Sequence, residues 1–288
     1  MNPATTTLES DAIFEISDLH LALGAGAFSQ KPLPVLKGVS LQLAAGESVS
    51  LLGRTSTGKS VLLRALTRFF RDLPVRSVEG EILFEGENLL KLGQNKLRRI
   101  RGTKIAYILQ NAHQLLNPQL TVAQHFDLLL KHNRADIKNR RDHAIDYLYQ
   151  VGVVDPEAII TETVFPEELS TAIRQKIMIA SALACEPRIL VADEPTAEFD
   201  SGTVTHIVRL FEKLKRERGL AILVATGRVR RAEQFGDRIG ILEDGRLVES
   251  AAPRELFDSG EHAATRAFVD GTLLAGAQRE RLVAHVYI

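Results

Sequence analysis

Residues 45–63 read AGESVSLLGRTSTGKSVLL, and this stretch decides the fold of the chain. Its apolar run 48–52 is compatible with a β-strand, and from residue 61 the apolar positions repeat with helical spacing. Between them lies the pattern G-x-x-x-x-G-K-S, residues 53–60. A strand, a tight glycine-bearing loop and a helix in this order predict a cradle of inward-pointing N–H groups that binds phosphate oxygens.

Side chains in this loop have the chemistry of a nucleotide site. Gly53 and Gly58 allow the turn, Lys59 can reach the β- and γ-phosphates, and the Ser60 hydroxyl can ligate Mg²⁺. The sequence therefore predicts nucleotide binding here. The candidate binding residues are Gly53, Arg54, Thr55, Ser56, Thr57, Gly58, Lys59, Ser60 and Val61.

A pair of carboxylates follows a second buried strand. Residues 188–192 are almost wholly apolar, as is typical of a strand in a parallel sheet, and Asp193 and Glu194 come directly after them. Together with an upstream phosphate loop, this pattern predicts that Asp193 coordinates Mg²⁺. Glu194 is then placed to polarise a water molecule for attack on the γ-phosphate.

The composition is that of an ordinary globular protein. Of the 288 residues, 45% are hydrophobic and 25% are charged, and the formal net charge is zero, so nothing favours nucleic acid as the main partner. Cys185 is the only cysteine, which excludes a disulfide within the chain and favours a reducing compartment. No apolar run approaches 18 residues, and residues 1–15 do not resemble a signal peptide. We expect a cytoplasmic protein that reaches a membrane only by docking onto other subunits.

Alternation and helical periodicity divide the chain into an α/β core and a helical insertion. Two alternating strands precede the phosphate loop, which predicts a small antiparallel sheet beside a mostly parallel one. The region from 122 to about 153 predicts two helices separated by charged residues, and the basic cluster 96–101 is expected to be a solvated helix face. Further strands are expected at 13–23, 35–43, 80–84, 104–109, 221–225, 239–242 and 246–249, and further helices at 167–184, 204–218 and in the tail from 253.

The order of these motifs resembles that of an ABC transporter ATPase subunit. The phosphate loop is followed by Gln110 at a strand end, by Leu169-Ser170 and Arg174-Gln175 before a helix, and by ILVADEPT at 189–196. Residues 110–118, 165–180, 255–257 and 262–267 are similar to the oligopeptide, dipeptide and nickel importer group. The resemblance runs from about residue 13 to residue 268.

This resemblance implies a fold, a cofactor set and partners. It implies an ABC ATPase domain at 12–250 with a helical lobe at about 112–184, and a helical tail at 251–288. Two ATPase subunits would pair head to tail around ATP and Mg²⁺ and energise two transmembrane permease subunits, with an extracytoplasmic solute-binding protein as an indirect partner. The chain would then lie peripherally on the cytoplasmic face of the inner membrane.

The resemblance also assigns roles to individual residues. Gln110 would sense the γ-phosphate and Mg²⁺, Asp193 would hold Mg²⁺, and Glu194 would be the general base. Ser170 would contact the nucleotide of the opposite subunit, and Asp200 would lie at the dimer interface. An aromatic residue that stacks on adenine is expected near the first strand, where Phe28 is a weak candidate.

Three departures from the family pattern bear on activity. Thr171 and Ala172 replace two glycines of the signature motif, where close approach and permissive φ/ψ angles are wanted. Gly227 replaces the switch histidine that contacts the γ-phosphate, and glycine has no side chain for that contact. Arg54 and Thr55 replace a Glu-Ser pair of the phosphate loop, which is most simply neutral variation.

Because the missing histidine affects this chain's own ATP site and the altered signature affects the partner's, we favour a heterodimer with slow or asymmetric hydrolysis. The alternative is a catalytically impaired, nucleotide-binding regulatory subunit. The retained Lys59, Asp193 and Glu194 argue against that alternative. A soluble ABC protein acting on DNA or the ribosome is disfavoured by the balanced charge. The chain does not specify the solute, which would be a peptide, nickel or a related compound.

Overall fold

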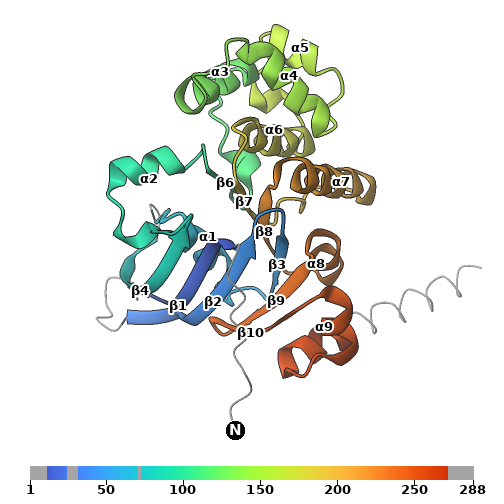
Figure 1. Cartoon of the computed structure of the whole chain (residues 1–288). Helices are drawn as coiled ribbons and strands as arrows, with labels where there is room; N and C mark the ends of the chain where they lie inside the picture. Colours follow the sequence, from blue (N-terminus) through green and yellow to red (C-terminus); the bar gives the residue numbers. More distant parts are fainter. Residues whose placement is uncertain (1–11, 25–31, 71–72, 272–288) are drawn as a thin grey trace, which may run out of the picture.

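A computed structural model describes residues 12–24, 32–70 and 73–271. Two sheets form the core, and a lobe of helices lies beyond one end of the larger sheet (Figure 1). The larger sheet has the strand order β10-β9-β3-β8-β7-β6, and all neighbours are parallel except the hairpin of β9 and β10. Its strands are β3 Ser48–Leu52, β6 Ile105–Ile108, β7 Ile189–Asp193, β8 Ala221–Thr226, β9 Arg238–Glu243 and β10 Arg246–Ala251.

The smaller sheet is antiparallel, with the strand order β2-β1-β4-β5. Long alternating strands form it because one face packs on the core while the other meets solvent. Phe14, Ile16 and Phe84 are on its buried face, and Phe14 pairs directly with Phe84 across β1 and β4. The strands are β1 Ala12–Gly24, β2 Pro32–Ala44, β4 Val75–Phe84 and β5 Glu87–Asn88.

The parallel strands are buried on both faces, so their side chains enter two different cores. In β7, Leu190 and Ala192 join a core with the helical lobe, whereas Ile189 and Val191 join a core with the antiparallel sheet. The helices around the sheets are α1 Lys59–Leu66, α2 Gln94–Ile100, α7 Ser201–Arg218, α8 Val229–Phe235 and α9 Pro253–Ser259. Short 3₁₀ helices occur at Leu89–Lys91, Ala112–Gln114 and Pro166–Glu168.

The helical lobe stands apart at the top of Figure 1 and holds α3 Val122–Asn133, α4 Arg140–Gln150, α5 Pro156–Thr161 and α6 Thr171–Ala184. A capping box starts α3, since the Thr121 hydroxyl accepts from the Gln124 amide while the Gln124 side chain accepts from the Thr121 amide. Phe126 and Tyr147 are almost fully buried where α3 and α4 meet α6. Because the same core continues into the sheet, the lobe is anchored to the strands that carry the site residues.

Most expected elements are present, and the exceptions have local causes. The helix expected at 167–184 begins only at Thr171, because Ser170 is its N-cap and accepts a hydrogen bond from the Ile173 amide. The short helices α5 and α8 were not expected. Helix α2 coincides with the expected basic helix. After α9 the chain forms one more helical stretch over 263–271, and residues 272–288 lie outside the described residues.

Candidate nucleotide-binding site

The loop at 53–58 joins β3 to α1 and needs both of its glycines. A Cβ on Gly53 would lie 2.5 Å from the Leu242 carbonyl oxygen and 2.7 Å from the Thr57 hydroxyl. Gly58 has φ +103°, and a Cβ there would press on the Val35 carbonyl oxygen and the Leu36 side chain at 3.2 Å. Neither glycine can therefore be replaced without displacing its neighbours, and at Gly58 the positive φ adds backbone strain.

Lys59 folds back over this loop. Its Nζ donates hydrogen bonds to the carbonyl oxygens of Gly53 at 2.6 Å and Arg54 at 2.7 Å. Burial lowers the pKa of Lys59, and the negative charges of Glu194 and Asp193 oppose that shift. The ammonium group is thus poised between the loop and the two carboxylates, in the place where phosphate oxygens would meet it.

Asp193 is the last residue of β7 and is buried. Burial raises its pKa, and a hydrogen bond from the Ser60 hydroxyl opposes the rise. The tertiary structure therefore brings Ser60 and Asp193 together across the start of α1. An oxygen pair of this kind, one hydroxyl and one carboxylate, is the donor set that suits Mg²⁺.

Arg64 and Tyr107 complete the surroundings of Asp193, and the sequence alone did not identify them. The positive charge of Arg64 opposes the rise that burial causes in the pKa of Asp193. Burial, and next the charge of Asp193, raise the pKa of Tyr107 well above its ordinary value, so the phenol stays neutral. Arg64 follows Lys59 within α1, and Tyr107 lies on β6 beside β7, so only strand order could have indicated their proximity.

Glu194 follows β7, and its side chain is held by the turn between β8 and α8. The Glu194 backbone is in the left-handed region, with φ 47°. One carboxylate oxygen accepts a hydrogen bond from the Thr226 hydroxyl at 3.0 Å, and the other accepts from the Gly227 amide at 2.6 Å. The carboxylate is thereby fixed in orientation next to Asp193, as a group that orients water must be.

Gly227 is not required by the backbone conformation. Its φ lies outside the left-handed region, and an added Cβ would have ordinary contacts, 3.6 Å from the Gly53 carbonyl oxygen and 3.7 Å from Glu194 Oε1. A Cβ atom is therefore accepted at this position without a clash. The space beside Glu194 is open because the residue is glycine.

Two arginines beside this space were also missed. Arg228 precedes α8 and is exposed, and Arg231 lies in the first turn of the helix and is half-buried. Burial, and next the charge of Arg228, lower the pKa of Arg231, while the negative charge of Glu194 opposes that shift. The sequence signal was the basic run at 228–231, directly after a strand that ends in the site.

Gln110 and Ser170 are related to the site in different ways. Gln110 is exposed just beyond β6, whose neighbour β7 carries Asp193, so both residues lie at the carboxyl edge of the sheet. Ser170 is exposed as the N-cap of α6, and α6 lies in the helical lobe, apart from α1 and the sheet end that carries the phosphate loop (Figure 1).

The expectation of a permissive backbone at residues 171 and 172 is wrong. Thr171 and Ala172 lie in the first turn of α6 and have no positive φ, so this conformation is open to any residue. Unlike glycines, Thr171 and Ala172 place side-chain atoms at the N-terminus of α6.

Of the other sequence candidates, Arg54, Thr55 and Ser56 are exposed on the loop, Thr57 is buried, and Val61 is half-buried in α1. Phe28 lies outside the described residues.

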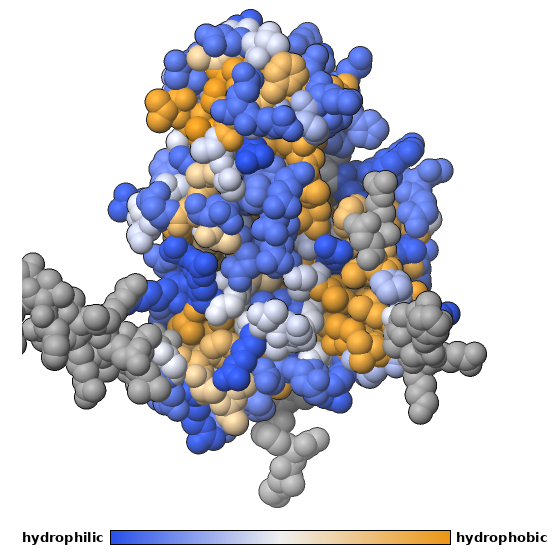
Figure 2. Space-filling view, turned by 180° about the vertical axis from the view of Figure 1, so that it is seen from behind, coloured by the Kyte–Doolittle hydropathy of each residue, from blue (hydrophilic) through white to orange (hydrophobic). Residues whose placement is uncertain are grey.

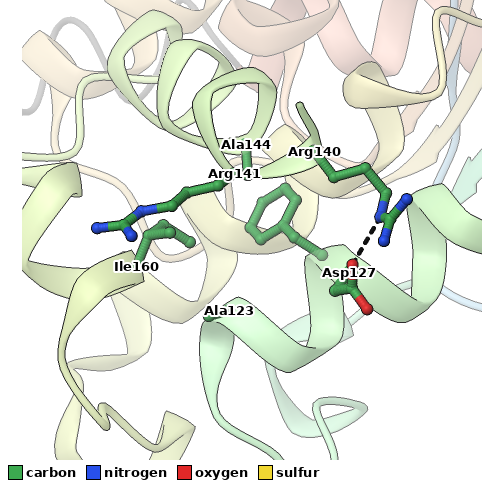
Figure 3. Close-up of a pocket in the computed structure, with 7 residues that line it drawn as sticks. Ala123, Asp127, Arg140, Arg141, Ala144 and Ile160 are labelled. Atoms are coloured by element: carbon green, nitrogen blue, oxygen red, sulfur yellow. Dashed lines mark hydrogen bonds and ion pairs between the residues drawn. The ribbon is translucent and has the colours of Figure 1, made fainter. Parts of the chain in front are cut away.

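The helical lobe contains a separate hollow of about 150 Å³ between α3, α4 and α5 (Figure 3). Phe126, Ala123 and Ile160 form its apolar floor. On one rim Arg140 forms an ion pair with Asp127 at 2.6 Å. On the other rim Arg141 extends over the hollow, and it has no ion-pair partner within the described part of the chain.

The face of the molecule seen in Figure 2 is mostly polar, with apolar surface in separate patches. Within the described residues, no helix combines the length and the apolarity needed to cross a bilayer.

Comparisons with known proteins agree with this geometry. The model of the ABC transporter family matches residues 36–197. A probable peptide ABC transporter ATP-binding protein of Sinorhizobium fredii is 34% identical over 263 residues, which are 91% of this chain and 77% of that protein. A dipeptide transport ATP-binding protein of Bacillus subtilis is 29% identical over 89% of this chain and 75% of its own length. A solved dimeric ATP-binding cassette, in a post-hydrolysis state with ADP and Pi, has a TM-score of 0.73 at 28% identity and covers 84% of this chain and 99% of its own.

Proposed function

The chain belongs to the ABC transporter family and carries its ATPase domain, and we propose that it energises an importer of peptides, nickel or related solutes. The observation that supports this most is the meeting of Lys59, Ser60, Asp193 and Glu194 at the carboxyl edge of the parallel sheet. Two relatives are named for peptide and dipeptide transport, which favours that class of solute.

The site fits ATP with Mg²⁺. Gly53 and Gly58 leave room for phosphate, and Ser60 and Asp193 supply oxygen ligands, with Gln110 at the same sheet edge as a third candidate. Mg²⁺ would neutralise negative charge on the phosphate oxygens. Lys59 binds the β- and γ-phosphates, and Glu194, held by Thr226 and Gly227, orients the attacking water and accepts its proton.

We further propose that the functional unit is an asymmetric heterodimer. Ser170 is exposed at the start of α6, away from its own phosphate loop, which suits a contact with the nucleotide of a second ATPase subunit. In a homodimer, each of the two ATP sites would contain both the altered signature and Gly227. In a heterodimer whose partner has an intact signature and an intact histidine, each ATP site would contain only one of these two changes.

The helical lobe is the proposed contact with the permease subunits. Among the described residues, four of the five exposed large hydrophobic side chains lie within 112–184, namely Leu115, Leu128, Tyr149 and Val154. The hollow of Figure 3 has an apolar floor, and the described residues offer no ion-pair partner to Arg141 at its rim. It therefore suits a permease loop that presents an apolar residue next to an acidic one. The chain would then be peripheral to the cytoplasmic face of the membrane.

This contact can be tested by co-purification with the permease. Arg141→Glu should weaken the association while nucleotide affinity is unchanged. The matched control is Arg209→Glu on α7, which is also exposed. Equal association of both variants would contradict docking in this hollow.

A regulatory subunit that binds ATP without hydrolysing it remains the second candidate, and Gly227 is the observation that favours it. The deciding experiment measures ATP binding and steady-state hydrolysis by the chain alone and with its partner subunits. Turnover that appears with the partners and disappears in Glu194→Gln supports the ATPase proposal. Binding without turnover in the complete complex would assign the regulatory role, and a homodimer that turns over about once per second or faster would exclude the heterodimer.

A further inference from the structure

The turn after β8 combines an open space with an unusual concentration of positive charge. Gly227 leaves room beside Glu194, and Arg228, Arg230 and Arg231 follow it directly. Helix α8 packs against both β8 and β3, the two strands whose ends carry Gly227 and the phosphate loop. Side chains of its first turn therefore lie at the edge of the nucleotide site.

Arg231 lies in the first turn of α8, and of these three arginines it alone is not fully exposed. Its charge interacts with that of Glu194 as well as with that of Arg228, and its side chain is half-buried whereas those of Arg228 and Arg230 are exposed. In the described part of the chain its guanidinium forms one hydrogen bond, from Nη1 to Gln234 Oε1 at 2.9 Å. A guanidinium has five N–H donors, so donors remain for an anion.

The Glu194 carboxylate does not accept hydrogen bonds from these Arg231 donors. Its two oxygens are bound by the Thr226 hydroxyl and the Gly227 amide. A half-buried cation near the carboxylate, but without a hydrogen bond to it, leaves positive potential at the place where the outermost phosphate would sit. A guanidinium suits phosphate because its planar fork can donate two parallel hydrogen bonds.

We propose that the Arg231 guanidinium binds the γ-phosphate of the nucleotide held by Lys59 and Ser60 of the same chain, through the space left open at Gly227. This inference rests on the proposed nucleotide-binding function and adds a specificity-determining residue to it. Since ADP lacks the γ-phosphate, Arg231 would contribute to ATP binding and not to ADP binding.

The test is the ratio of affinities for a non-hydrolysable ATP analogue and for ADP, measured by fluorescence titration of the full chain with Mg²⁺. Arg231→Ala should reduce the preference for the ATP analogue about tenfold while ADP affinity is unchanged. Arg230→Ala removes the same charge one residue earlier, from an exposed side chain, and should leave both affinities unchanged. Retained ADP affinity also shows that the variant is folded.

The remaining outcomes separate this inference from the proposed function. If Arg231→Ala keeps the preference, or if Arg230→Ala loses it equally, the role of Arg231 is overturned while the chain is still a nucleotide-binding protein. If the unmodified chain binds neither nucleotide, the proposed function fails and the inference fails with it. If Arg231→Ala does not fold, Arg231→Lys and Arg231→Gln repeat the test, since only the lysine keeps the charge. Equal preference in these two variants would overturn the proposal.

Discussion

The ends of two neighbouring strands differ sharply in how far they follow the family pattern. Leu52 at the end of β3 pairs with Thr226 at the end of β8, so the loops that follow lie side by side. The loop after β3 retains both glycines, the lysine and the serine of a phosphate loop. The loop after β8 has Gly227 and a run of arginines in place of a histidine and its neighbours.

The two loops also differ in the room that their glycines leave for a side chain. A Cβ at Gly53 or Gly58 would collide with backbone or with the apolar interior, whereas Gly227 has ordinary space around it. Substitution at Gly53 or Gly58 would therefore distort the phosphate loop, whereas substitution at Gly227 would change mainly the chemistry of the turn after β8.

The largest expected effect tests whether this chain's own ATP site, with its retained phosphate loop and its altered turn after β8, hydrolyses ATP. Glu194→Gln should reduce steady-state ATP hydrolysis of the assembled complex by about 10²- to 10⁴-fold, because an amide cannot accept a proton from water. ATP binding should persist. Glu233→Gln, an exposed carboxylate on α8, is the control. Turnover that survives in Glu194→Gln would mean that this chain's own site does not hydrolyse ATP.

The next largest effect tests whether the loop after β3 binds phosphate. Lys59→Ala should weaken ATP binding by about ten- to a hundredfold, because it removes a charge-assisted contact with phosphate. Equilibrium titration of the chain alone measures this. Lys213→Ala on the exposed face of α7 should bind like the unmodified chain. Equal affinities for all three proteins would contradict phosphate binding at this loop.

A smaller effect tests the altered loop directly. Gly227→His should raise ATP turnover in the assembled complex by about tenfold, because the backbone accepts a side chain here and imidazole adds a polar contact to the γ-phosphate. Gly227→Ala fills space without polar atoms and should leave the rate within about twofold. A similar rate in both variants would show that position 227 does not limit turnover.

The smallest effect concerns stability and its dependence on pH. Because burial raises the pKa of Asp193, the folded chain binds more protons than the unfolded chain between the ordinary carboxyl pKa and the raised one. Stability without nucleotide should therefore fall as pH rises through that window. Asp193→Asn should raise the melting temperature at neutral pH and flatten this dependence. A lower melting temperature for Asp193→Asn across the whole pH range would contradict this account.

Much of the fold followed from local patterns, and the exceptions were short. The strands around the phosphate loop and the carboxylates appeared where periodicity placed them, because buried parallel strands are continuously apolar. The helices α5 and α8 were missed because six or seven residues carry too little periodicity to be recognised. Helix α6 starts later than the helical pattern suggested, because the Ser170 hydroxyl accepts a capping hydrogen bond from the Ile173 amide and so fixes the first turn at Thr171.

The sequence by itself determined the groups that act through neighbours in the chain: the loop of Gly53 to Ser60 and the adjacent pair Asp193 and Glu194. Only the tertiary structure decided which distant groups meet. It brings Ser60 to Asp193, fixes Glu194 on the Gly227 amide, and brings the charge of Arg231 within range of the same carboxylate. The reason is physical, since a motif encodes local geometry through its spacing, whereas the meeting of strand ends depends on sheet order and core packing over the whole domain.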